Sequence, residues 1–219
     1  MEDVLDLYAE PEDPRYPQVC FDESPVQLTS ETRHPLPARP GQPACYDSEY
    51  KRAGTANLFL FVQPLRGWRH VNVTHQRTKQ DFAQQMCLLV DDYFPTAERI
   101  RLVVDNLNTH TPAALYSVVP PHEARRITRK LEFHYTPKHG SWLNMAECEL
   151  AVLAGQCLDR RIPNIETLRE AIAAWQGPRN QCQTKIHWQF STDVARTKLK
   201  RLYPAVEPTE DPAKPKEAS

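Results

Sequence analysis

Two aspartates stand at positions where they could hold metal ions beside a phosphate. Asp22 closes the apolar run Val19–Phe21, and Asp105 closes the run Leu102–Val104. Short apolar runs predict buried strands, and ligands gather at the carboxyl ends of parallel strands, so both carboxylates could reach one crevice. Oxygen ligands suit Mg²⁺ or Mn²⁺, and two such ions about 4 Å apart promote phosphoryl transfer. Strand-ending aspartates also form turns and cap helices, so these two residues alone leave both interpretations open.

A third acid is expected on the apolar helix predicted over Asn144–Leu158, which offers Glu147 and Glu149. The two glutamates are separated by about 200° around a helix, so only one of them can face the aspartates. Glu147 lies in line with Ala151 and Ala154, small residues that would let the helix approach a sheet closely. Glu147 also has capping-box spacing from Asn144, which leaves a purely structural alternative open.

The elements that would position these acids alternate between apolar strands and amphipathic helices. Thr78 and Asp81 have the spacing of a capping pair, and Thr111-Pro112 opens a short helix. Four prolines, at positions 35, 37, 40 and 43, predict an irregular segment over 31–57. The order indicates an α/β fold, a mixed sheet flanked by helices, and is compatible with a ribonuclease H-like architecture. Strands are expected at 18–22, 58–65, 68–74, 100–105 and 131–136, and longer helices at 78–94, 121–130, 144–158, 164–176 and 191–202.

Charge and proline divide the chain of 219 residues into a basic body and two acidic ends. The net charge is −1 overall; residues 1–17 carry −5 and residues 203–219 carry −2, which leaves +6 for residues 18–202. A basic body suits contact with phosphates. We therefore expect a disordered, acidic, proline-rich N-terminus over 1–17, one catalytic domain over 18–202, and a disordered proline-rich tail over 203–219.

Other features exclude several classes of protein. No apolar run approaches the roughly 18 residues of a membrane span, and the acidic start is not a signal peptide. The six cysteines are scattered without any Cys-x-x-Cys pair. This pattern indicates a reducing, cytoplasmic compartment and argues against a zinc site.

Three ordered motifs carry a resemblance to a known family. They are Cys20–Glu23, then Val104–Asn106 followed by His110, then Ser141–Glu147, which ends in Leu-Asn-x-x-Glu. In this order they resemble the acidic motifs of the mariner superfamily of DDE transposases, most closely its bacterial insertion-sequence branch of the six-thirty type. The resemblance implies a ribonuclease H-like DDE domain and assigns the third acid to Glu147. It makes Asp22, Asp105 and Glu147 the catalytic ligands of two Mg²⁺ or Mn²⁺ ions.

The same resemblance implies an activity and partners. The activity is metal-dependent cleavage of transposon ends and strand transfer into target DNA, typically at TA, by a homodimer acting in the bacterial cytoplasm on nucleoid DNA. Members of the family carry helix-turn-helix domains ahead of the first aspartate, and only 21 residues precede Asp22 here. The chain is therefore expected to be a catalytic half. One alternative is a catalytically silent remnant that binds DNA or inhibits full-length transposase; another is a different ribonuclease H-like nuclease or integrase.

Several basic residues are candidates for contact with DNA. The long proline-rich loop offers four of them, because loops of that length usually have a function: Arg33, Arg39, Lys51 and Arg52. Lys138 and His139 precede the third acid in a glycine-containing loop, where they either meet the scissile phosphate or are only solvated. His110 would contact DNA, orient Asp105, or simply occupy the turn before Thr111.

Two other groups have structural interpretations. The basic run Pro121–Lys130 is typical of a solvated helix face. Trp188 and Phe190 are expected to pack the last helices against the core rather than to stack on bases.

Overall fold

The computed structural model describes residues 1–33, 35–45, 47–107 and 109–203. Apart from Tyr203, the predicted C-terminal tail lies outside the described residues. Within the described part of the chain, no helix combines the length and the apolar character needed to cross a bilayer.

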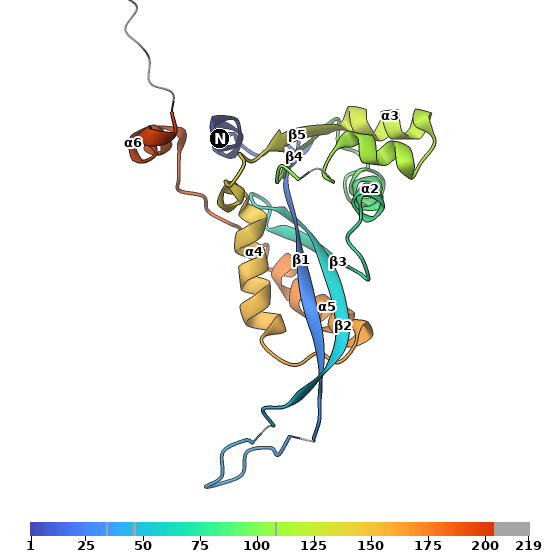
Figure 1. The fold of residues 1–219 in the computed structure, drawn as a ribbon. Coiled ribbons are helices and arrows are strands. Elements are labelled where there is room, and N and C mark those ends of the chain that lie inside the picture. The colour runs from blue at the N-terminus through green and yellow to red at the C-terminus, as the bar shows by residue number, and fades with distance from the viewer. Residues whose placement is uncertain (34, 46, 108, 204–219) are drawn as a thin grey trace, which may run out of the picture.

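A mixed five-stranded sheet forms the centre of the molecule (Figure 1). Its strands lie in the order β3-β2-β1-β4-β5. The first three pair as antiparallel neighbours, whereas β4 pairs in parallel with both β1 and β5. The predicted α/β, ribonuclease H-like fold class is therefore confirmed. The strand bounds are β1 Gln18–Glu31, β2 Tyr50–Gln63, β3 Trp68–Thr74, β4 Ile100–Val104 and β5 Leu131–Tyr135.

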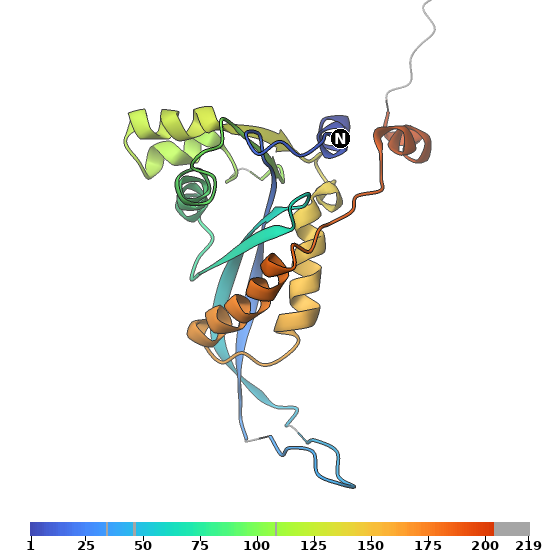
Figure 2. The ribbon, with the colours of Figure 1, turned by 180° about the vertical axis from the view of Figure 1, so that it is seen from behind.

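Helices cover both faces of this sheet because the strands are apolar on both sides. Side chains alternate along β1, so Phe21 joins one buried cluster and Cys20 joins the other. The Phe21 face is covered by α2 (Lys79–Leu88, continued by a π-helical turn) and α3 (Pro121–Lys130). The Cys20 face is covered by α4 (Met145–Leu153, also continued by a π-helical turn) and α5 (Ile165–Gln181), as Figures 1 and 2 show.

The proline-rich segment is shorter than predicted, because β1 and β2 extend into a long hairpin that leaves the body of the molecule (Figure 1). Glu31 still pairs with Tyr50, so the irregular connection covers only residues 32–49. The register shifts between Gln27 and Thr29, opposite Gly54, whose φ of 105° suits a β-bulge. The pairing of β1 with β2 stabilises this extension of both strands. The sequence of either strand alone does not predict it.

The expectation of a disordered N-terminus is wrong. Residues Glu2–Ala9 form helix α1, whose side chains Val4, Leu5 and Leu7 are buried. Its acidic outer face is paired with distant basic groups: Arg196 on helix α6 (Thr192–Lys198) contacts Glu2, and His134 contacts Asp3. Because this helix contributes to the core, α1 is part of the folded domain.

Candidate active site

Asp22 and Asp105 lie level with each other where β4 ends. The parallel pairing of β1 with β4 runs as far as Cys20 opposite Val103, and each aspartate lies two residues further along its strand direction. Contrary to the prediction, Asp22 does not end its strand, because β1 continues to Glu31 along β2. Asp22 nevertheless lies level with the carboxyl end of β4, because β4 ends at Val104 while β1 continues.

Asp22 is a buried carboxyl group surrounded by other acids. Its side chain is on the sheet face that α4 covers, only 8% of the residue is exposed, and Oδ1 accepts a hydrogen bond of 2.8 Å from the amide of Glu23. Burial raises the pKa of Asp22 to about 7; the negative charges of Glu147 and Asp105 also raise it, while the bond from Glu23 opposes the shift. The pKa of Asp22 therefore depends on the charges of both other predicted acids.

Asp105 is held by His110, which is fully buried between the rings of Phe21 and Phe82. The other ring nitrogen of His110, Nε2, lies 3.6 Å from a carboxylate oxygen of Glu23. Burial lowers the pKa of His110, but the interactions with Asp105 and Glu23 outweigh burial and raise it to about 9. His110 is therefore a buried cation between two acids, and its predicted contact with DNA is wrong because its side chain does not reach the surface.

Glu147 lies in the first turn of α4 with an exposed side chain. The capping-box alternative fails here, because the amide of Asn144 donates to the carbonyl of Ser141 (2.7 Å) and not to Glu147. The helix is instead capped by Asn144, whose Oδ1 accepts from the amide of Ala146 (3.1 Å). The side chain of Glu147 is consequently free of the helix start.

Asn144 has a second contact that the sequence did not predict. Its Nδ2 donates a hydrogen bond of 2.8 Å to the carbonyl oxygen of Phe21, and the whole residue is buried. The start of α4 is thereby tied to β1 directly beside Asp22. The Leu-Asn-x-x-Glu motif contains this asparagine, but its buried donor contact depends on a strand more than 100 positions earlier in the sequence.

Glu149 points away from the aspartates into a buried ion-pair network. One of its carboxylate oxygens lies 2.7 Å from Nε of Arg69, which is fully buried on β3. Arg179 on α5 donates two further hydrogen bonds, of 3.0 and 3.2 Å. Glu149 thus fixes the rotation of α4 from the opposite side. Sequence analysis did not identify either arginine as its partner.

The loop between β5 and α4 presents polar groups ahead of Glu147 in the chain. Lys138 and His139 are exposed, and His139 has a left-handed backbone with a φ of 64°, which costs free energy for a non-glycine residue. Trp142, in the short turn before α4, is 46% exposed and packs edge-to-face against Phe190. This exposed tryptophan was not singled out from the sequence.

The donor set of the three predicted acids fits a hard divalent cation. Asp22, Asp105 and Glu147 supply only carboxylate oxygens, the ligands that Mg²⁺ and Mn²⁺ prefer. The pKa of Asp22 is raised first by burial and then by the charges of Glu147 and Asp105, and a bound cation would offset both effects. Even so, no group of three His, Cys, Asp or Glu side chains in the described residues stands close enough together to hold a metal ion. A closed three-carboxylate cluster is therefore not formed.

Comparison with known proteins identifies the family. The model of the family described as DDE superfamily endonuclease matches residues 17–169. The chain belongs to this family. A comparison with curated proteins found no match.

Solved structures of the Mos1 mariner transposase have a similar fold. The Mos1 strand transfer complex matches with 16% sequence identity and a TM-score of 0.57, over 83% of this chain and 54% of that one. The Mos1 mariner paired end complex with Mn matches with 16% identity and a TM-score of 0.53, over 78% and 51%. At this identity the likeness concerns the fold alone, and this DDE endonuclease chain spans about half the length of the Mos1 chains.

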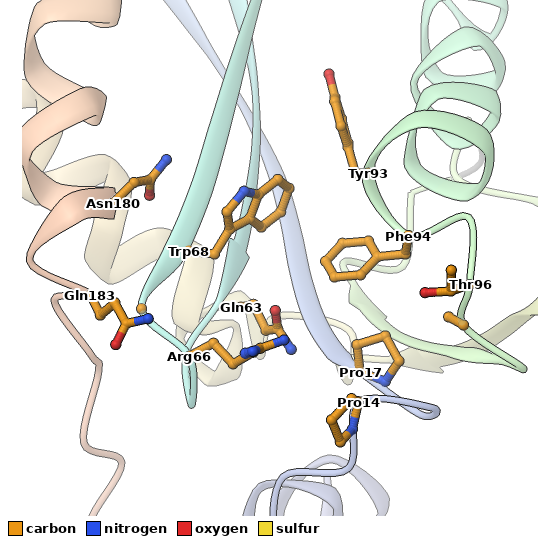
Figure 3. Close-up of a pocket in the computed structure, with 12 residues that line it drawn as sticks. Pro14, Pro17, Gln63, Arg66, Trp68, Tyr93, Phe94, Thr96, Asn180 and Gln183 are labelled. Atoms are coloured by element: carbon orange, nitrogen blue, oxygen red, sulfur yellow. The ribbon is translucent and has the colours of Figure 1, made fainter.

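A cavity of about 350 Å³ lies at the opposite end of the parallel strands from the acids of this DDE endonuclease (Figure 3). Trp68, Phe94 and Arg66 line it together with Pro17, which precedes β1, and Ala97, which precedes β4. None of the predicted catalytic or DNA-binding residues contributes to its wall. The cavity is therefore separate from the candidate active site.

The raised pKa of Asp22 predicts that its charge destabilises the metal-free protein. A carboxyl group whose pKa is higher in the folded state contributes stability at low pH, and this contribution is lost as the pH rises from about 4 towards 7. We expect Asp22→Asn to raise the melting temperature in EDTA at pH 8, with a smaller gain at pH 5. Thermal denaturation checks this, with Asp92→Asn, an exposed aspartate, as the control. An equal effect of Asp22→Asn at both pH values would contradict it.

The two glutamates of α4 predict opposite mutational effects. Glu149→Gln leaves the buried guanidinium of Arg69 without its counter-charge, and breaking a buried ion pair in this way costs about 3–5 kcal/mol. Glu147→Gln changes an exposed side chain and should leave the free energy of unfolding nearly unchanged. Urea denaturation of the two variants measures the difference. Similar losses in both would show that the ion-pair network does not stabilise the fold.

Proposed function

We propose that this chain is the catalytic domain of a DNA transposase that cleaves DNA strands and joins them to a target, of the bacterial insertion-sequence six-thirty type. One observation carries the proposal: Asp22 and Asp105 lie level on neighbouring parallel strands, with Glu147 in the first turn of the adjoining helix. This arrangement occurs in a chain of the DDE superfamily endonucleases whose fold resembles that of Mos1.

In this proposal Asp22, Asp105 and Glu147 would be the ligands of two Mg²⁺ or Mn²⁺ ions. Bound in this way, such ions activate an attacking oxygen and stabilise a leaving one. The protein's own contribution is to aim the ligands. His110 holds Asp105 from within the core, the β1–β2 ladder holds the backbone of Asp22 opposite Leu60, and α4 carries Glu147.

The proposed substrate is DNA, comprising transposon ends and a target. We assign contacts with its backbone to exposed basic residues on the long hairpin and in the loop before α4, namely Arg39, Lys51, Arg52, Lys138 and His139. Arg33 is also exposed, but its Nε lies 3.4 Å from a carboxylate oxygen of Asp47. This ion pair weakens the attraction of Arg33 for a phosphate. The basic face of α3 is partly neutralised in the same way, since Arg126 pairs with Asp91 and Glu123.

A homodimer is the proposed active form, because joining two transposon ends requires two catalytic sites and two of the Mos1 structures with a similar fold are paired-end complexes. We propose that α1 and α6 belong to the catalytic domain together with residues 18–202. Both helices are included because Glu2 and Arg196 join them across the chain.

The decisive experiment is metal-dependent nicking of supercoiled DNA. Asp22→Asn keeps the size of the side chain but removes a charge that a divalent cation needs. We expect it to abolish Mn²⁺-dependent nicking and the rise in melting temperature that millimolar Mn²⁺ produces in the wild type.

Asp92→Asn is the matched control and should retain both properties. Equal nicking by wild type and Asp22→Asn would mean that the site is wrong. Wild-type protein that binds DNA but neither binds Mn²⁺ nor nicks would favour a silent remnant that occupies DNA.

The proposed DNA contacts of the hairpin predict a change in salt dependence. Each phosphate contact contributes about 0.9 to the slope of log affinity against log salt concentration. Lys51→Ala combined with Arg52→Ala should therefore weaken DNA binding and reduce that slope by one to two, whatever the DNA sequence. Binding titrations at several salt concentrations measure it.

Arg126→Ala serves as the control, because this arginine is already paired with Asp91 and Glu123. An unchanged slope in the Lys51/Arg52 double variant would remove the hairpin from the proposed DNA surface.

A further inference from the structure

We infer that Asn144 is a positioning residue that sets the spacing between Asp22 and Glu147; the inference rests on the proposed metal-dependent function. Asn144 is fully buried, and both ends of its side-chain amide are used. Its Nδ2 donates to the carbonyl oxygen of Phe21 at 2.8 Å, and its Oδ1 accepts from the amide of Ala146 at 3.1 Å.

The two partners of Asn144 adjoin the two acids. The carbonyl of Phe21 belongs to the peptide bond that leads into Asp22, and Ala146 is the residue immediately before Glu147. A single side chain therefore links the backbone next to one acid with the backbone next to the other. Any displacement of α4 along or away from β1 must stretch one of these two hydrogen bonds.

Helix capping alone does not account for an asparagine at this position. Helix α2 is capped by Thr78 and α6 by Ser191, each through a hydroxyl oxygen. Asn164 caps α5 through its Oδ1, which accepts from Thr167 at 2.8 Å. Serine, threonine and asparagine are all good caps because each offers an oxygen. A hydroxyl donates and accepts through a single oxygen, whereas an amide has a separate nitrogen that donates. At Asn144 this nitrogen makes the hydrogen bond to β1.

A second hydrogen bond holds the same turn against α1. The hydroxyl of Tyr8 donates to the carbonyl of Leu143 at 2.9 Å and accepts from the amide of Met145 at 3.4 Å. The same hydroxyl lies 3.5 Å from Sγ of Cys20 on β1, so Tyr8 also spans the two elements, through residues two positions before each acid. Asn144 differs from Tyr8 because its partners directly adjoin Asp22 and Glu147 in the chain.

The test removes the donor of Asn144 and keeps the cap. Asn144→Ser retains an oxygen that can accept from Ala146 but cannot reach Phe21. We expect its dissociation constant for Mn²⁺, measured by calorimetry, to rise about ten-fold or more, as happens when groups that orient metal ligands are removed. Nicking of supercoiled DNA should fall by about 100-fold, because an error of about 1 Å in a reacting centre has that effect.

Asn164→Ser is the matched control, since it makes the same change at a helix cap away from the acids. It should bind Mn²⁺ and nick DNA like the wild type. A further comparison separates positioning from general stability. In a Glu147→Gln background, Asn144→Ser should cause no additional loss of Mn²⁺ affinity, because the ligand that it positions is already gone. An additional loss would assign Asn144 a merely structural role.

If Asn144→Ser does not fold, Asn144→Gln replaces it, because the longer amide keeps both groups while changing the spacing that they set. Unchanged Mn²⁺ affinity in a folded variant would overturn the inference while leaving the proposed function intact. So would failure of both variants to fold, since the residue would then be required for the fold itself. Wild-type protein that neither binds Mn²⁺ nor nicks DNA would overturn the proposed function together with this inference.

Discussion

Burial of a carboxyl group on the central strand is the constraint around which the candidate site is arranged. Burial raises the pKa of Asp22 most, and the negative charges of Glu147 and Asp105 raise it further, because both effects oppose ionisation. The other acids of the site are Glu23, Asp105 and Glu147. Two of these acids share one buried cation, because His110 contacts Asp105 on one side and Glu23 on the other. Asp22 forms no ion pair among the described residues, and its pKa rises chiefly because it is buried, with the charge of His110 opposing the rise. A divalent cation bound there would stabilise the ionised carboxylate that burial disfavours.

Helix α4 carries two glutamates, two positions apart, that have opposite environments. Glu149 is buried and fully engaged by Arg69 and Arg179, whereas Glu147 is exposed. The two side chains are separated by about 200° around the helix. Because the ion pairs of Glu149 orient it towards β3 and α5, Glu147 must lie on the opposite side of the helix. A buried ion pair adds little net stability compared with apolar residues of the same size. It favours one rotation of the helix because any other rotation would leave a buried charge without its partner. The orientation of Glu147 therefore depends on a network that it does not touch.

Local sequence was sufficient for features that depend on a single element. The apolar runs before Asp22 and Asp105 predicted adjacent strands, and helical spacing separated Glu147 from Glu149. Features that depend on partners far along the chain were missed. β1 extends past Asp22 because β2 pairs with it, and α1 is folded because Val4, Leu5 and Leu7 are buried against elements far along the chain. The burial of His110 follows from Phe21 and Phe82, which lie far from it in sequence.

The three acids are also held with different rigidity, and the difference follows from where each is attached. Asp22 lies inside a continuous strand with its backbone paired opposite Leu60, so its position is fixed by the ladder itself. Asp105 lies just past the end of β4 and relies on a side-chain contact with His110. Glu147 depends on a helix whose start is tied to the strand by an amide, and its own side chain remains exposed. Sites built on strands and helices hold their geometry better than sites on loops. In this molecule strand pairing holds Asp22, a side-chain contact holds Asp105, and the side chain of Glu147 is exposed. We therefore expect adjustment of the site to a ligand to fall to Glu147 rather than to the sheet.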